Sequence, residues 1–322
     1  MSLDNFIQVI GGQLLNTPCI SSFNYIQDCV SHISRGDLFI AKNQSDIKVA
    51  VENGAYAILS DFKPEIIDKE IAWILVDDLD KAIKKLIRYT LIKTDIEFFY
   101  LKSVEFEIAL GINKDERVYF LSENLLKCYK DITNNRYKLL FIISDDNKLL
   151  NDIYPNFNTS KEYSFDIKII SKRLFSTTLV YKKHYFEQIK ISSLFLTELN
   201  SVLNFFDDHE IEYDLFKYQP KYHFKPLFLS KELKPLGFGE SQRVLICEKE
   251  KSFLDRETKY LQNEAPWANI KVIKANPNKN IKQILDESLR YYHFILIYGS
   301  CATIQLYLHS DKKDTCKKNL FD

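Results

Sequence analysis

The first 93 residues alternate between short apolar runs and amphipathic stretches. Continuous apolar runs lie at residues 38–41, 55–59 and 73–76. Such runs are typical of parallel strands that are buried on both faces. Apolar residues recur at helical spacing over 45–54, where a glycine ends the pattern, and again over 79–90. Asp77 or Asp78 can cap the second helix. The pattern predicts a compact α/β domain over residues 1–93.

The middle of the chain continues this alternation and then changes to an antiparallel pattern. Buried parallel strands are predicted at 118–121 and 139–143, joined by a helix over 123–132. Two further runs, 176–181 and 185–191, flank a short polar turn and predict a hairpin, which a helix follows over 194–206. We therefore predict a second, reduced α/β domain over residues 94–222.

The last part of the chain, residues 223–322, is predicted to be a Rossmann-like domain. Strands at 243–247, 270–273 and 294–298 alternate with helices at 253–262 and 281–291. Ligands of such sheets bind beyond the carboxyl ends of the strands. That rule identifies Glu248, Lys274 and Gly299-Ser300-Cys301, and gives a tentative cleft of Glu248, Gly299 and Ser300. A nucleophilic serine or cysteine here lacks an assignable histidine or acidic partner, so no catalytic residue is predicted.

An ordered set of short motifs in residues 20–93 carries a family resemblance. Gly36-Asp37-Leu38-Phe39 opens the first strand, a helix ends in Asn53-Gly54-Ala55, and Val76-Asp77-Asp78 precedes the next helix. Together they resemble the UDP-sugar-binding N-terminal domain of the Mur ligases, of the MurE and MurF kind, which add amino acids to the peptidoglycan precursor. The resemblance implies three α/β domains that end in a Rossmann-like domain. It places Ser31, Arg35 and Asn43 around the nucleotide-sugar site.

The chain departs from the Mur ligase pattern where that family binds nucleotides. Cys29-Val30-Ser31 stands in place of an Asp-Ser-Arg triplet, and Lys42-Asn43-Gln44-Ser45 in place of a glycine-rich loop. Residues 98–103 lack glycine where the family has a Gly-Lys-Thr loop, and none of the eight glycines is followed by lysine. Leu196-Thr197 replaces a His-Asn pair, although Asn200 matches the asparagine that follows that pair. The resemblance therefore implies a degenerate relative without the ATP-binding loop.

Composition narrows the functional classes. Lys plus Arg and Asp plus Glu number 44 each among 322 residues, so no net field attracts nucleic acid or an anionic membrane. The six cysteines show no CxxC pair and no metal-ligand spacing with the six histidines. The longest apolar stretches are strand-sized. We therefore expect a cytoplasmic protein with reduced thiols, no bound metal, no nucleic-acid partner and no membrane insertion.

Two polar clusters allow alternative interpretations. Asp207-Asp208-His209-Glu210 contains potential metal ligands, but neighbouring residues at a helix end point in different directions, which favours a solvated turn. Residues 237–241 contain two glycines and resemble a phosphate-binding turn, but they precede a strand instead of linking a strand to a helix. A structural turn is therefore favoured there.

These observations together predict a non-catalytic or diverged Mur-ligase-like protein, with no cofactor assigned. It is expected to bind a UDP-sugar precursor of peptidoglycan, or to act as a scaffold among cell-wall synthesis proteins. Two alternatives stay open. One is a diverged peptidoglycan-precursor ligase with a non-standard nucleotide site, and the other is a protein-interaction module unrelated to the cell wall.

Overall fold

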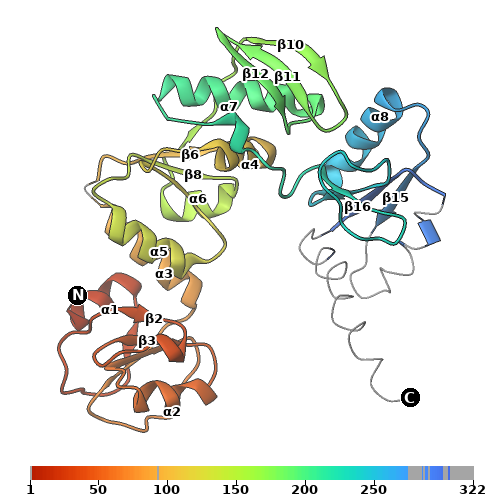
Figure 1. Ribbon diagram of the computed structural model, residues 1–322. Coiled ribbons are helices and arrows are strands. Elements are labelled where there is room, and N and C mark those ends of the chain that lie inside the picture. The colour runs from red at the N-terminus through yellow and green to blue at the C-terminus, as the bar shows by residue number, and fades with distance from the viewer. Residues whose placement is uncertain are drawn as a thin grey trace, which may run out of the picture. The chain divides into compact units, whose positions relative to one another are not determined.

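The chain divides into two compact units, which Figure 1 shows as parts of one computed structural model. The N-terminal unit contains residues 1–100 and 116–159, and the C-terminal unit contains residues 101–115 and 160–322. The structure describes residues 2–92, 94–274, 285, 287, 288, 291–299 and 304. The chain thus crosses between the units three times. The three-domain division at residues 93 and 222 stays a prediction.

The N-terminal unit begins with a five-stranded sheet of order β1-β5-β4-β3-β2. Its strands are β1 (Gln13–Leu14), β2 (Ile26–Gln27), β3 (Leu38–Ala41), β4 (Ala57–Ser60) and β5 (Ala72–Leu75). Its helices are α1 (Leu3–Ile10), η1 (Val30–His32), α2 (Ser45–Glu52) and α3 (Leu79–Leu91). Strands β2 to β5 pair in parallel, and β1 pairs antiparallel to β5. The three predicted strands and two predicted helices are confirmed, whereas α1, β1 and β2 were not predicted.

Both faces of this sheet are buried, which explains the continuous apolar runs. Along β3, Leu38 and Ile40 belong to a core that includes residues of α1 and α3. The alternate residue Phe39 belongs to a second core, with Ile47 of α2 and Trp73 of β5. Successive side chains of a strand point to opposite faces, so a strand covered on both sides requires apolar residues throughout.

A second sheet of the N-terminal unit is wholly parallel, with order β7-β8-β6-β9. Its strands are β6 (Glu97–Tyr100), β7 (Val118–Phe120), β8 (Phe141–Ser144) and β9 (Asn158–Thr159), and its helices are α5 (Leu125–Asn135) and α6 (Asn147–Ile153). Helix α3 packs against α5 and α6, and one hydrophobic core contains residues of both sheets. The predicted parallel strands joined by a helix are confirmed as β7, α5 and β8.

The C-terminal unit begins with α4 (Ser103–Ile112), which packs against α7 (Leu196–Asp208). An antiparallel three-stranded sheet precedes α7 and contains the predicted hairpin. Its strands are β10 (Ile167–Lys172), β11 (Thr177–Tyr181) and β12 (His184–Ile189). Two short helices, η2 (Ser193–Phe195) and η3 (Leu215–Lys217), flank α7.

A four-stranded sheet of order β13-β14-β16-β15 completes the C-terminal unit. Its strands are β13 (Lys225–Phe228), β14 (Val244–Glu248), β15 (Ile270–Lys274) and β16 (Phe294–Tyr298), with helices η4 (Lys251–Phe253) and α8 (Leu254–Glu264). The pairs β14–β16 and β15–β16 are parallel, as predicted for a Rossmann-like half, and β13 adds an antiparallel edge. The predicted helix over 281–291 lies largely outside the described residues. Among the described helices, none is long and apolar enough to cross a lipid bilayer.

Candidate functional site

The start of α4 is the position at which a Mur-ligase-like chain is expected to bind phosphate. Only Leu101 and Lys102 separate β6 from α4, and neither is glycine. A phosphate-binding loop of the Gly-Lys-Ser/Thr type spans about eight residues, whose backbone N–H groups surround the phosphates. Two residues cannot form such a loop, so the structure gives a geometric reason for the departure seen in the sequence.

A carboxylate already occupies the N-terminus of α4. Glu105 is 5% exposed, and its Oε2 accepts a hydrogen bond from the backbone N–H of Lys102 at 3.1 Å. This contact is one half of a capping box. Burial raises the pKa of Glu105, and the Lys102 N–H partly opposes that rise. A negative group in this place satisfies a helix donor that a phosphate would otherwise use.

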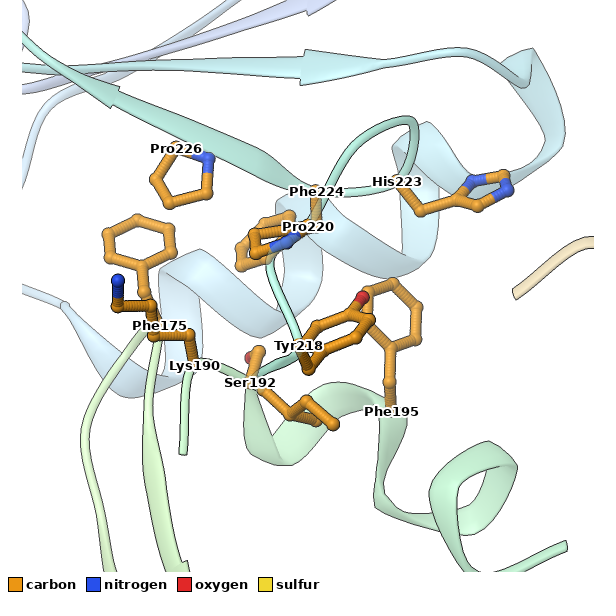
Figure 2. A pocket seen from close by; sticks show the side chains of 10 residues that line it. Phe175, Lys190, Ser192, Phe195, Tyr218, Pro220, His223, Phe224 and Pro226 are labelled. Carbon is orange, nitrogen blue, oxygen red and sulfur yellow. The ribbon is translucent and has the colours of Figure 1, made fainter. Parts of the chain in front are cut away.

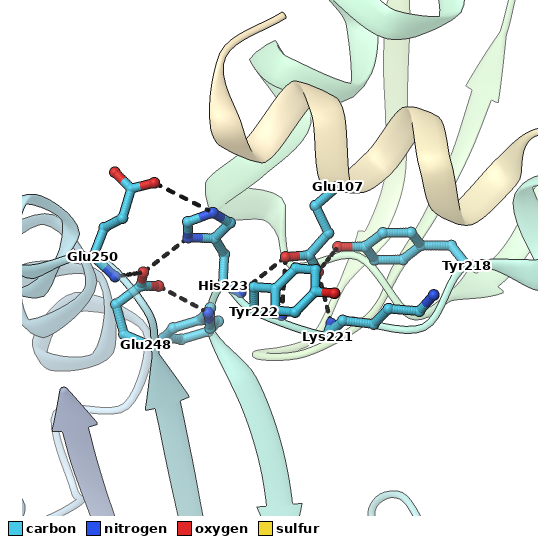
Figure 3. Close-up of polar contacts among 8 residues, drawn as sticks. Glu107, Tyr218, Lys221, Tyr222, His223, Glu248 and Glu250 are labelled. Carbon is cyan, nitrogen blue, oxygen red and sulfur yellow. Dashed lines mark hydrogen bonds and ion pairs between the residues drawn. The ribbon is translucent and has the colours of Figure 1, made fainter. Parts of the chain in front are cut away.

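Helix α4 carries a second buried carboxylate, Glu107, which accepts hydrogen bonds from four donors (Figure 3). Glu107 is 2% exposed, and it accepts the hydroxyl of Tyr218 at 3.1 Å. It also accepts the backbone N–H groups of Lys221, Tyr222 and His223, at 2.7, 3.0 and 2.9 Å. Hydrogen bonds from several N–H groups stabilise a carboxylate that has been removed from water. Glu107 therefore holds a chain segment that lies more than a hundred residues away in the sequence.

Glu248, predicted as part of a C-terminal cleft, lies at the carboxyl end of β14 and is 0% exposed. Its Oε1 accepts from Nδ1 of His223 at 2.8 Å and from the backbone N–H of Glu250 at 2.7 Å. Its Oε2 accepts from the backbone N–H of Phe224 at 3.1 Å. The carboxylate is thus bound by groups of its own chain, and its geometry is that of a structural anchor.

The charges around His223 favour the imidazolium form. Burial lowers the pKa of His223, but the hydrogen bond and charge of Glu248, with the charges of Glu107 and Glu250, outweigh it and raise the pKa above 6.5. Burial acts to raise the pKa of Glu248, but hydrogen bonds from His223 and Glu257 outweigh burial and lower that pKa. Glu257 of α8 is itself 0% exposed. The result is a buried ion pair in contact with a further carboxyl group.

The pocket beside this network is too small for a nucleotide (Figure 2). Its free space is about 10 Å³, roughly room for one water molecule, whereas small-molecule sites occupy about 300–1,000 Å³. It is lined mainly by aromatic, proline and aliphatic side chains, with a few polar ones: Phe175, Lys190, Ile191, Ser192, Phe195, Tyr218, Pro220, His223, Phe224 and Pro226. The ammonium group of Lys190 donates to Gln219. The pocket is therefore a packing gap in the C-terminal unit.

The tentative residues of the N-terminal unit are exposed and lie at different ends of β3. Arg35 precedes the strand, whereas Asn43 follows it. Ser31 lies in η1, where its hydroxyl is 3.0 Å from the sulfur of Cys29. Asn43 Oδ1 accepts from the backbone N–H of Asp46 at 3.0 Å and so caps the first turn of α2. The structure separates Arg35 from Asn43, and a common role for the three stays a proposal.

The remaining candidates are structural or lie outside the described residues. Gly299 donates its N–H to the backbone carbonyl of Glu248 at 2.9 Å, whereas Ser300 and the side chain of Lys274 are not among the residues described. Asn200 is 3% exposed and binds backbone groups at 164 and 166. The side chains of residues 207–209 have separate partners. Asp207 accepts from Tyr181 and Lys182, and Asp208 accepts from the hydroxyl of Tyr163. The imidazole of His209 lies against the carbonyl of Phe205.

Sequence reasoning missed Glu107 and His223. The signal for Glu107 was present, because two glutamates interrupt the otherwise apolar stretch Val104–Ile112, and buried charges require partners. The partners could not be identified from the sequence, since they follow in residues 218–223 and the pairing depends on tertiary structure. His223 gave no local signal, because it precedes a strand and lies in no motif.

Comparison with known proteins supports the fold alone. No protein-family model matches the sequence, and no curated protein sequence matches it. A crystal structure of MurF from Acinetobacter baumannii is similar, with a TM-score of 0.57 and 10% identity, over 96% of this chain and 98% of that chain. A structure of UDP-N-acetylmuramoylalanyl-D-glutamyl-2,6-diaminopimelate–D-alanyl-D-alanyl ligase from the same organism has a TM-score of 0.57 and 11% identity, over 96% and 97% of the two chains. The chain therefore has a Mur-ligase-like α/β fold of several domains, at an identity too low to show more than the fold.

Proposed function

We propose that this protein is a diverged Mur-ligase-like protein that binds a UDP-sugar precursor of peptidoglycan without ligating it at the expense of ATP. In this role it acts in the cytoplasm, as a precursor-binding protein or as a scaffold for enzymes of cell-wall synthesis. The fold supports the choice of ligand class, because one of the similar solved structures is a UDP-N-acetylmuramoylalanyl-D-glutamyl-2,6-diaminopimelate–D-alanyl-D-alanyl ligase.

The connection between β6 and α4 is the observation that carries this proposal. Leu101 and Lys102 are too few to surround a phosphate, and Glu105 occupies the helix N-terminus with its own carboxylate. A phosphate about 4 Å from that carboxylate would meet a repulsion of about 4 kcal/mol per unit charge at an effective dielectric constant of 20. Both features oppose ATP binding at this position and leave binding of the precursor unaffected.

Thermal unfolding with and without ligand tests the proposal. The probes are UDP-N-acetylmuramic acid, a UDP-N-acetylmuramoyl peptide, and ATP with Mg²⁺. A ligand present at a hundred times its Kd stabilises the folded state by about 2.7 kcal/mol, which corresponds to a Tm rise of about 5–10 °C for a unit of this size. We expect such a rise with a UDP precursor and none with ATP.

Three variants locate the binding. Arg35→Ala and Asn43→Ala test the two ends of β3, and Lys69→Ala, an exposed residue of the same unit, is the matched control. The proposal predicts that at least one of the first two reduces the rise while Lys69→Ala keeps it. A rise with ATP, accompanied by release of phosphate, would instead establish a ligase with a non-standard nucleotide site. No rise with any probe would favour the protein-interaction alternative.

A further inference from the structure

Residues 218–224, which we call the connecting segment, lead from η3 into β13 and are held by carboxylates (Figure 3). The backbone N–H groups of four consecutive residues, 221 to 224, all point at side chains rather than at secondary structure. The first three donate to Glu107, and the fourth donates to Glu248. Consecutive N–H groups that converge on one anion form a nest, and here the anion is a side chain of the same protein.

The two carboxylates come from elements that are far apart in the sequence. Glu107 belongs to α4, and Glu248 ends β14. Both are buried, at 2% and 0% exposed, so neither keeps water as a substitute partner. If the connecting segment moved away, four N–H groups and Glu107 would lose these hydrogen bonds together, and Glu248 would keep the one from the N–H of Glu250 but lose those from His223 and Phe224. Such a loss is all-or-none, because partial release leaves a buried charge poorly compensated.

A strained residue ends the connecting segment. Phe224 has φ 45°, in the left-handed region that a bulky side chain rarely adopts. Its ring packs between Phe175, at 5.4 Å, and Tyr260, at 5.7 Å between ring centroids. The surrounding contacts therefore maintain a backbone conformation that the free segment would leave. Stored strain and an all-or-none set of hydrogen bonds are the properties of an element with two discrete states.

We propose that the connecting segment is a conformational latch, which Glu107 and Glu248 close. In the closed state it joins α4 to the four-stranded sheet of the C-terminal unit. In the open state the segment becomes an extended linker, and the sheet is no longer fixed to α4. The proposal does not depend on the ligand of the N-terminal unit, so its test is separate from the ligand-binding test.

Limited proteolysis reports the state of the latch, because Lys221 offers trypsin an exposed side chain on a backbone that the latch holds rigid. Glu107→Gln removes the charge and presents an amide donor to the N–H groups. We expect cleavage after Lys221 to accelerate by at least about 100-fold, given that each hydrogen bond to a charged group contributes about 1.5–3 kcal/mol. Glu105→Gln is the matched control, since it alters a buried glutamate of the same helix that the connecting segment does not touch.

The two variants together decide the outcome. Accelerated cleavage in Glu107→Gln, with Glu105→Gln close to the natural protein, supports the latch. Equal acceleration in both variants would show general destabilisation of α4 and overturn it, as would an unchanged rate in Glu107→Gln.

Amide hydrogen exchange of the unaltered protein provides a second test that needs no variant. The latch requires the amides of Tyr222, His223 and Phe224 to be protected and to share one protection factor, which is the free-peptide exchange rate of each amide divided by its rate in the protein. Exchange at the rate of a free peptide, or with three unrelated protection factors, contradicts the proposal even if the Glu107 variant fails to fold.

Discussion

Glu248→Gln distinguishes a structural anchor from a ligand-binding carboxylate. The substitution keeps the shape of the side chain and removes its charge. It leaves the imidazolium of His223, 3% exposed, without its partner at 2.8 Å, and places an amide group beside backbone donors. Breaking a buried ion pair by removing one partner costs about 3–5 kcal/mol. For a unit of this size we expect a fall in Tm of about 6–20 °C.

Urea unfolding followed by fluorescence measures this loss and assigns it to a unit. Trp73 is buried in the N-terminal unit, whereas Trp267 is 57% exposed in the C-terminal unit. In a Trp267→Phe background the remaining signal reports the N-terminal unit alone. We expect Glu248→Gln to leave that signal unchanged and to shift the transition that circular dichroism detects in the C-terminal unit.

Glu250→Gln is the control for Glu248→Gln. Its carboxylate is 39% exposed and lies 3.9 Å from Nε2 of His223, so its removal is expected to cost less than about 1 kcal/mol. A loss below about 1 kcal/mol in Glu248→Gln as well would refute the anchor. That result would return Glu248 to the role of a carboxylate kept available for a ligand.

Two further predictions concern pH and the N-terminal sheet. The pKa of His223 is raised, so its contribution to stability is fully present below pH 6.5 and is lost as the pH rises through the folded-state pKa. The pKa of Glu248 is lowered, so its contribution to stability is present above pH 4.5 and is lost as the pH falls through the folded-state pKa. Urea midpoints of the C-terminal unit should therefore be highest between these values, and His223→Asn should flatten the alkaline decline; a decline of equal size in that variant would exclude His223 as its source. In the N-terminal unit, the side chain of Asn16 makes three hydrogen bonds, to the backbone carbonyls of Lys69 and Ile71 just before β5 and from the N–H of Trp73. Each of these hydrogen bonds contributes about 1 kcal/mol, so Asn16→Ala should lower the free energy of unfolding by about 3 kcal/mol, as measured by Trp73 fluorescence in urea. The control Asn5→Ala loses one exposed hydrogen bond and should cost less than about 1 kcal/mol. Equal losses in the two variants would contradict this account.

The sequence was sufficient for the elements whose pattern is local. The apolar run 38–41 and the capped helix α3, with Asp78 accepting from the N–H of Lys81, are encoded within a few residues, and both are confirmed. Helix α1 was not predicted, although Leu3, Phe6 and Ile10 follow helical spacing and are buried.

The network around Glu107 could not be predicted, because its geometry depends on residues that are distant in the sequence. The carboxylate and its donors are separated by 111 to 116 residues, and no spacing rule connects them. Glu248 was identified from the rule that ligands bind at the carboxyl ends of parallel strands. Glu248 does lie at the carboxyl end of β14, but in the structure its hydrogen-bond partners are groups of the protein itself.

The three crossings between the units have a consequence for synthesis on the ribosome. The N-terminal unit needs residues 116–159 to complete its second sheet, so it cannot finish folding until about half of the chain has been made. Helix α4 is synthesised before that point, but its partner α7 and the donors to Glu107 follow much later. During that interval a helix with the apolar residues Val104, Phe106 and Ile108 is uncovered, and its carboxylate Glu107 lacks its donors. The nascent chain therefore passes through a stage at which chaperones that recognise apolar segments have a defined target.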